Sequence, residues 1–99
     1  MQNSDLTGYS ILIVEDEPLL RKQIAAHLER LGADVTQVDS VQRAKKILED
    51  LSFDFALLDV NLPDGLGLDL LKAKSFPANT GVIVMTAEGA VTGAVEAMR

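Results

Sequence analysis

Acidic and hydroxyl side chains follow three separate apolar runs in this chain. Glu15 and Asp16 come after the first run, Asp59 ends the second, and Thr86 follows the third. Three carboxylates in one crevice would repel one another, and a hard divalent cation such as Mg²⁺ would remove that repulsion. A carboxylate beside Mg²⁺ is a suitable phosphoryl acceptor, and the Thr86 hydroxyl could donate to the new phosphoryl oxygens. These residue types therefore predict magnesium-assisted phosphoryl transfer.

The segments that must position these residues alternate between short apolar runs and longer helical patterns. The apolar runs are typical of strands, and they cover 11–14, 33–38, 53–58 and 81–85. Helical patterns cover 18–31, 41–51, 66–74 and 91–99. Pro18 suits the first turn of the first helix, and Ser40 is placed to cap the second. This alternation predicts an α/β fold, with parallel strands covered by helices on both faces. Ligands of such a sheet bind beyond the carboxyl ends of its strands, which is where the polar residues lie.

The composition excludes several other functions. The chain has 15 Asp and Glu against 9 Lys and Arg, and this acidic balance argues against direct binding to nucleic acid. It has no cysteine and a single histidine, His27, so neither thiol chemistry nor a structural zinc site is expected. No apolar run is long enough to span a membrane, and we expect a cytoplasmic protein. Residues 1–9 are polar and are expected to be a disordered lead to one domain, 10–99.

Three motifs, in this order, resemble the receiver family of two-component response regulators. They are ILIVEDEP at 11–18, LLDVNLPDG at 57–65 and VIVMTA at 82–87. The resemblance covers the chain from about residue 10 to its last residue, and 86–99 is similar to receivers attached to enhancer-binding activators of the AAA+ type. It implies a flavodoxin-like, doubly wound sheet with strand order 2-1-3-4-5.

The resemblance also implies a role for each site residue. A partner histidine kinase would phosphorylate Asp59. Mg²⁺ would be bound by the side chains of Asp16 and Asp59 and by the backbone carbonyl of Asn61. Glu15 stands where many family members have Asp, and its extra methylene suggests that it binds the ion through water.

The switch is expected to run through the last of the three motifs. The resemblance implies that Thr86 moves toward the phosphoryl group and that the N–H of Ala87 also contacts it. The change would pass into the fourth helix and on to a covalently linked, transcriptional output domain. The module would dephosphorylate itself slowly and would turn over no substrate.

Other interpretations of the acids remain open. Glu15 and Asp16 could cap the helix that Pro18 opens, and capping is the role we assign to Glu17. A phosphatase of the haloacid-dehalogenase type also uses an Asp nucleophile with Mg²⁺, but it needs a second Asp where this chain has Asn61. A pseudo-receiver that only binds a partner usually lacks one of the acids.

The chain departs from the family at its C-terminal end. The resemblance implies a fifth strand carrying a Lys and then a fifth helix, whereas this chain stops at Arg99 and has no Lys after Lys74. We therefore expect a C-terminally incomplete receiver, truncated after the start of the fourth helix. The edge at 82–85 is apolar and uncharged, which favours a homodimer or a swapped oligomer of the 99-residue chain.

Overall fold

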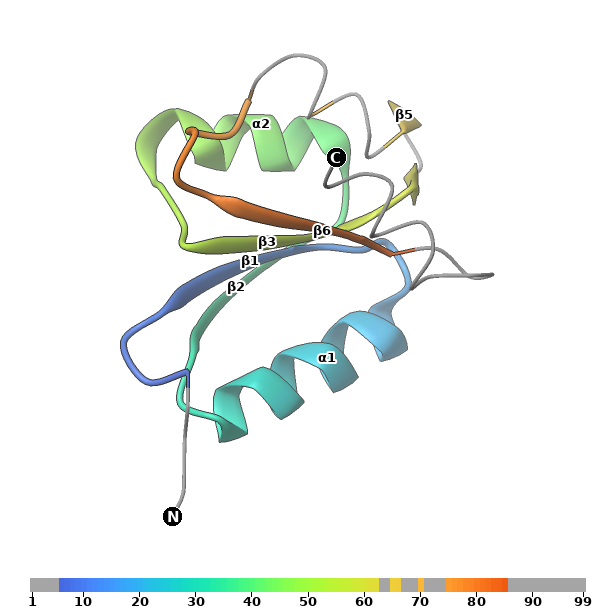
Figure 1. The fold of residues 1–99 in the computed structure, drawn as a ribbon. Helices are drawn as coiled ribbons and strands as arrows, with labels where there is room; N and C mark the ends of the chain where they lie inside the picture. The colour runs from blue at the N-terminus through green and yellow to red at the C-terminus, as the bar shows by residue number, and fades with distance from the viewer. Residues whose placement is uncertain (1–5, 63–64, 67–69, 71–74, 86–99) are drawn as a thin grey trace.

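The protein is described by a computed structural model at residues 6–62, 65–66, 70 and 75–85 (Figure 1). Within these residues the elements follow one another in the order β1 (Ser10–Val14), α1 (Pro18–Arg30), β2 (Asp34–Val38), α2 (Val41–Asp50), β3 (Phe55–Asp59), β4 (Asn61–Leu62), β5 (Gly65–Leu66) and β6 (Gly81–Met85). The predicted alternation is therefore confirmed for all four predicted strands, the last of which is β6, and for the first two predicted helices.

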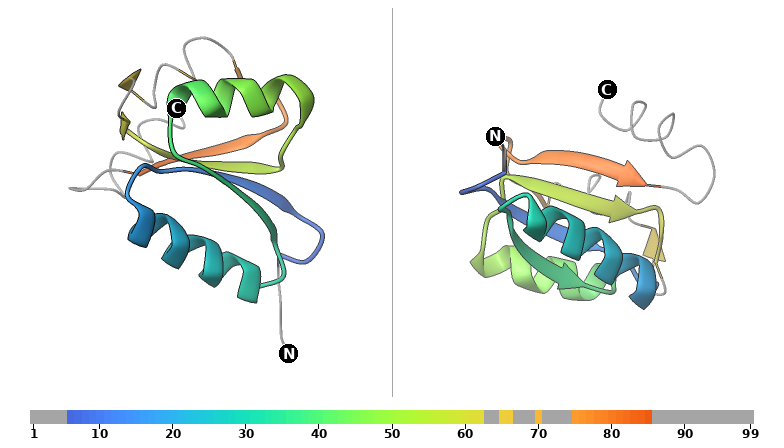
Figure 2. Two further views of the ribbon diagram at one scale, coloured as in Figure 1. Left: turned by 180° about the vertical axis from the view of Figure 1, so that it is seen from behind. Right: turned by 90° about the horizontal axis from the view of Figure 1, so that it is seen from below.

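The four long strands form one parallel sheet in the order β2-β1-β3-β6. When only the parallel strands are numbered along the chain, β6 is the fourth strand, and the order is the predicted 2-1-3-4. Helix α1 covers one face of the sheet and α2 covers the other, as both views in Figure 2 show. Strands β4 and β5 form a separate antiparallel pair directly after β3.

The central strand β1 is buried on both faces because a helix packs on each. Leu12 and Val14 belong to the core beneath α2, whose own contributions include Val41 and Ala44. Successive side chains of a strand point to opposite faces, so Ile11 and Ile13 face α1. All four apolar residues of β1 are 3% exposed or less, and this explains their unbroken apolar run.

The two helices begin as their sequences predict. Pro18 opens α1, where a missing N–H costs no hydrogen bond. The Ser40 hydroxyl accepts a hydrogen bond from the backbone N–H of Arg43 at 3.1 Å and caps α2. Gly32 follows α1 with a φ of 100°, and a Cβ at this position would collide with the Thr7 side chain. Glycine is therefore required at the turn into β2.

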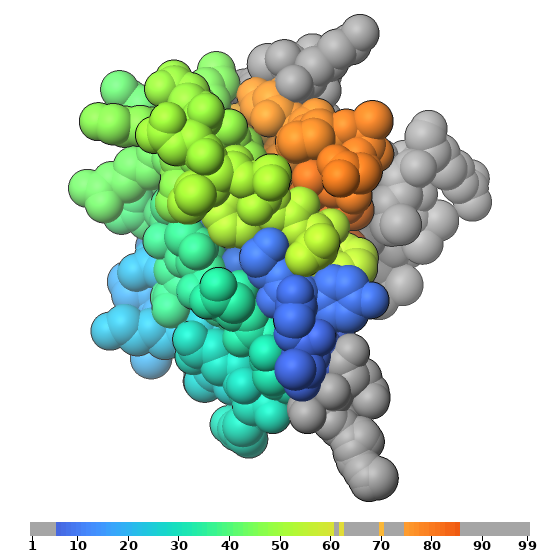
Figure 3. Space-filling view, turned by 90° about the vertical axis from the view of Figure 1, so that its left-hand side faces the viewer, coloured from blue at the N-terminus to red at the C-terminus, as the bar shows by residue number. Residues whose placement is uncertain are grey.

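Part of the expected N-terminal lead belongs to the fold. The Leu6 N–H donates to the Leu31 carbonyl at 3.1 Å, and the Asp34 N–H donates to the Tyr9 carbonyl at 2.9 Å. Figure 3 looks onto this end of the molecule, where the blue segment lies against the teal end of α1 and the yellow-green start of β3. Residues 1–5 lie outside the described residues, so the ordered part begins no later than Leu6, whereas the sequence placed it at residue 10.

The segment after β3 differs from its prediction. Leu66 pairs with Asn61 in the β4–β5 hairpin instead of opening a helix. Leu70 is helical and fully buried, but the rest of the predicted helix at 66–74 lies outside the described residues. The predicted fourth helix, from Val91 onward, also lies outside them.

Candidate metal centre

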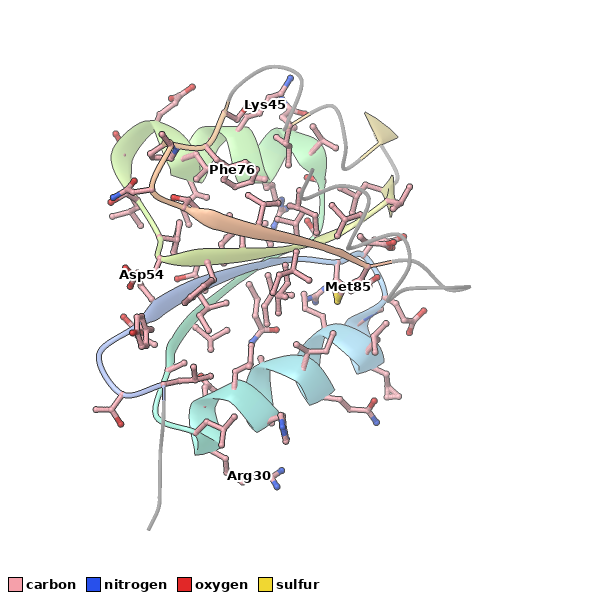
Figure 4. The ribbon with its side chains drawn as sticks, in the orientation of Figure 1. Arg30, Lys45, Asp54, Phe76 and Met85 are labelled. Atoms are coloured by element: carbon pink, nitrogen blue, oxygen red, sulfur yellow. The ribbon has the colours of Figure 1, made fainter. Side chains whose placement is uncertain are left out.

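The acids are brought together by the register of two neighbouring strands. In the parallel pair β1–β3, Val14 lies opposite Leu58, so the next residues, Glu15 and Asp59, lie side by side at the carboxyl ends of the two strands. In Figure 4, Met85 marks this end of the sheet and Asp54 marks the opposite end. Because the strands are parallel, their carboxyl ends meet at one edge, as the sequence predicted.

Glu15, Asp16 and Asp59 form one cluster. Each offers a carboxylate oxygen, and these three oxygens all lie within 4.8 Å of one another. Glu15 is buried, Asp59 is half-buried and Asp16 is exposed, so the cluster is closed on the protein side and open to solvent on the other. The predicted acid cluster is therefore confirmed as an arrangement of side chains.

Three hydrogen bonds hold Glu15 in place. Its backbone N–H donates to the Val38 carbonyl at 3.1 Å, which extends the β1–β2 ladder by one residue. Its carboxylate Oε2 accepts the N–H of Glu17 at 3.0 Å. Its backbone carbonyl accepts a hydrogen bond from Nη1 of Arg21, also at 3.0 Å. The β1–α1 loop is thus held from three directions.

The helix-capping interpretation is only partly correct. Glu17 occupies the N-cap position of α1, but its side chain makes no capping hydrogen bond. The Glu15 carboxylate instead binds the N–H of Glu17, just before the helix begins. Glu15 therefore orders the loop and also contributes to the acid cluster, while Glu17 has the predicted N-cap position without a side-chain capping bond.

The pKa of the Glu15 carboxyl is raised to about 7, chiefly by burial. The negative charge of Asp59 and hydrogen bonds with the Asp59 and Asp16 carboxyls contribute to this rise, and the Glu17 N–H opposes it. The three acids thus resist being ionised together, which is the penalty that a divalent cation removes. Hard oxygen donors, excess negative charge and an open side for water are the conditions that Mg²⁺ requires, and the described residues fit it.

The end of β6 lies beside the cluster. Met85 lies opposite Asp59 in the β3–β6 register, and its carbonyl accepts the Val60 N–H at 3.1 Å. The predicted switch residues Thr86 and Ala87 come next but lie outside the described residues. The backbone of Asn61 lies in β4, two residues after Asp59, and its role as a ligand stays a prediction.

Two further residues bear on the site: one lies outside the acid cluster, and the other contacts the loop that carries two of the acids. His27 is exposed on α1 and does not belong to the cluster, as expected. Arg21 was not singled out from the sequence, although it contacts the loop that carries two of the acids. The sequence does place Arg21 on the helix that follows the acidic pair, within reach of that loop, and this position could have indicated the contact.

The chain resembles known proteins along nearly all its length. The sequence profile of the response regulator receiver domain matches residues 11–99. Response regulator protein PilR of Pseudomonas aeruginosa is 36% identical over 89 residues, which are 89% of this chain and 20% of PilR. The phosphate regulon transcriptional regulatory protein PhoB of the same organism is 34% identical over 87 residues, 85% of this chain and 38% of PhoB.

Solved structures agree with the sequence comparisons. The MaeR response regulator bound to beryllium trifluoride has a TM-score of 0.70 and 33% identity, covering 90% of this chain and 75% of that one. The chain spans about a fifth of the length of PilR, so it matches only one part of such a protein. No helix among the described residues is long and apolar enough to cross a membrane.

Proposed function

Because this chain belongs to the response regulator receiver family, we propose that it is a phosphorylation-dependent switch in which Asp59 accepts the phosphoryl group. One observation carries the proposal: Asp59 leaves the sheet beside Glu15 and Asp16, with carboxylate oxygens of all three within 4.8 Å. A half-buried carboxylate at the open side of such a cluster can reach a donor from solvent. Burial disfavours Glu15 as the acceptor, and the place of Asp59 in the LLDVNLPDG motif at 57–65 favours it over the exposed Asp16.

The reaction transfers a phosphoryl group from a phosphohistidine of a partner kinase. A carboxylate oxygen of Asp59 attacks phosphorus, the new O–P bond forms, and the P–N bond to the histidine breaks. Asp16 and Asp59 would hold Mg²⁺ by their side chains, with the Asn61 carbonyl as a third ligand and Glu15 acting through water. When bound, Mg²⁺ supplies positive charge that offsets the acids and the phosphoryl oxygens.

The phosphorylated state is transmitted from the end of β6. Thr86 donates its hydroxyl to the phosphoryl group, the Ala87 N–H also contacts it, and the change passes to the following helix. The position of Met85 opposite Asp59 supports this route, because the end of β6 lies beside the acceptor.

The response is transcriptional and is carried out by a linked output domain in the cytoplasm. PhoB is by name a transcriptional regulatory protein, and PilR extends far beyond the matched region. Residues 86–99 resemble receivers of enhancer-binding activators. The match covers only 20% of PilR, which is consistent with a receiver joined to a larger protein of that kind. The receiver itself would contact no nucleic acid, since the chain carries a formal net charge of −6.

A switch is favoured over an enzyme that turns over a substrate. The residue two positions after the acceptor is Asn61, and a haloacid-dehalogenase phosphatase needs an Asp there to act as acid and base. A pseudo-receiver is disfavoured because the acid cluster is complete. The module therefore stores a phosphoryl group and loses it slowly.

Beryllium fluoride tests this proposal without a kinase. We expect the wild-type protein to bind beryllium trifluoride in the presence of Mg²⁺, with a new ¹⁹F resonance and amide shifts around Asp59. Asp59→Asn should abolish the signal, whereas Asp50→Asn, which removes an exposed acid at the end of α2, should leave it unchanged. Equal binding by wild type and Asp59→Asn would contradict the proposal.

A further inference from the structure

We propose that Arg21 is a positioning residue, which holds the Glu15–Asp16 pair in the arrangement that receives the cation. The inference rests on the proposed function, because the role of Arg21 depends on the acid cluster binding a cation. Arg21 acts on the backbone of Glu15, through the hydrogen bond from Nη1 to the carbonyl oxygen at 3.0 Å.

The geometry makes Arg21 a brace between α1 and the loop. Its backbone N–H donates to the Glu17 carbonyl at 2.9 Å, which fixes the residue in the helix. Its side chain then turns back across the loop to Glu15. The opposite side of Glu15 is held by the Val38 carbonyl in β2. The direction in which Glu15 and Asp16 leave β1 is thus fixed between a strand and a helix.

The energetics favour a substantial role for this bond. Glu15 is only 3% exposed, and Arg21 is the donor recorded for its carbonyl among the described residues. A buried carbonyl that loses its donor destabilises the loop, so the loop would rotate toward water to recover a partner.

The surroundings of Arg21 allow a clean test. Its side chain lines a polar hollow of about 140 Å³, together with Gln37, Val38, Asp39 and Arg43. Replacing Arg21 therefore leaves no hole in the apolar core. Arg43 lines the same hollow, and its Nε lies 3.4 Å from Oδ1 of Asp39. Arg43 is thus a control that removes the same charge from the same hollow.

The experiment compares Arg21→Gln, Arg21→Lys and Arg43→Gln with the wild-type protein. Mg²⁺ affinity is measured by titration of amide shifts, and hydrogen exchange of the Glu17 amide is measured in metal-free protein. We expect Arg21→Gln to bind Mg²⁺ at least about tenfold more weakly, as is usual when a group that orients metal ligands is lost. Glu17 should also exchange faster. Arg21→Lys should recover part of both properties, and Arg43→Gln should match the wild type.

The readouts separate positioning from general stability and from charge. A merely structural role would speed the exchange of core amides such as those of Leu12 and Leu58 as much as that of Glu17. Unchanged Mg²⁺ affinity in Arg21→Gln would overturn the inference, and so would an equal loss in Arg43→Gln, which would identify charge as the cause. A wild-type protein that binds no Mg²⁺ would contradict the proposed function itself, whatever the exchange of Glu17 shows.

Discussion

Glu15 combines two roles that place opposite demands on its carboxyl group. It is buried among other acids, which raises its pKa to about 7, and it accepts the Glu17 N–H, which favours the ionised form. A cation would resolve this conflict by stabilising the charged cluster. Without one, the carboxyl takes up protons at a pH where an exposed Glu has lost them.

The raised pKa predicts how stability depends on pH in metal-free protein. The folded pKa of Glu15, about 7, lies above the usual 4.5, so the folded state binds more protons than the unfolded state between these values. The stability contributed by this group is fully present below the unfolded pKa and is lost as the pH rises through about 7. Glu15→Gln should therefore stabilise metal-free protein at pH 8 by roughly 1–3 kcal/mol, because each pKa unit corresponds to about 1.4 kcal/mol.

Urea unfolding at pH 5 and pH 8 in the presence of a chelator measures this effect. The wild type should lose stability between the two pH values, and Glu15→Gln should lose much less. An equal pH slope for the two proteins would show that Glu15 does not titrate in this range.

Asp16 is the exposed member of the cluster, so it can be changed without disturbing the core. Asp16→Asn should remove most of the Mg²⁺ affinity, by about tenfold or more, because one charged oxygen ligand is lost while the other acids remain. Amide-shift titration of the variant beside Asp50→Asn provides the comparison. Affinity equal to wild type in Asp16→Asn would exclude this carboxylate as a ligand.

At the residue scale, the identities of the clustered acids were predictable, but their environments were not. Glu15, Asp16 and Asp59 were recognisable because each follows an apolar run, and parallel strands end at one edge. The contrast between buried Glu15 and exposed Asp16 depends on how the loop turns after β1, which residue types do not specify. The Arg21 contact was missed for the same reason, since it is made to a backbone carbonyl.

At the scale of elements, capping of α2 is a local feature with a measurable contribution. Ser40→Ala removes the acceptor for the Arg43 N–H and should cost about 1 kcal/mol. That loss lowers the melting temperature by roughly 4–8 °C in a domain of this size. Thermal unfolding of Ser40→Ala beside Ser40→Asn, which can still cap the helix, tests the assignment. Equal destabilisation in both variants would show that the hydroxyl is not acting as a cap.

The limits of sequence prediction at this scale are visible at two places. Phe53 is buried but lies outside β3, because its carbonyl accepts the Thr80 hydroxyl at 2.7 Å rather than joining the sheet. An apolar run in the sequence predicts that its residues are buried, but not that their backbones pair with a neighbouring strand. Leu66 was assigned to a helix, yet it pairs with Asn61 across a short hairpin, since pairing of the segment that follows β3 outweighs helix propensity.

At the scale of the whole molecule, β6 is an edge strand of the sheet within the described residues, where it pairs with β3 alone. An apolar hollow of about 180 Å³ lies beside it on the α1 face. Its lining is contributed by Leu6, Ile11, Leu28, Phe55, Leu57 and Ile83. An unpaired, uncharged edge next to apolar surface favours pairing with another chain.

We therefore predict that the 99-residue polypeptide associates with itself, as a homodimer or a swapped oligomer. Ile83→Lys should weaken association, because it places a charge on the β6 edge, where Ile83 is 36% exposed. Leu51→Lys changes another exposed apolar residue, away from this edge, and should have no effect. Light scattering on protein of verified mass measures the outcome. A cooperatively unfolding wild-type monomer would contradict the prediction.

The central claim, that Asp59 is the phosphoryl acceptor, is tested most directly by locating the label. The protein is incubated with Mg²⁺ and a small acyl or amido phosphate, reduced with borohydride to trap the acyl phosphate, and digested for peptide mass analysis. We predict reduction at Asp59 alone, with no product in Asp59→Asn and an unchanged yield in Asp50→Asn. A label on a serine, a threonine or His27, or an undiminished yield in Asp59→Asn, would contradict the account.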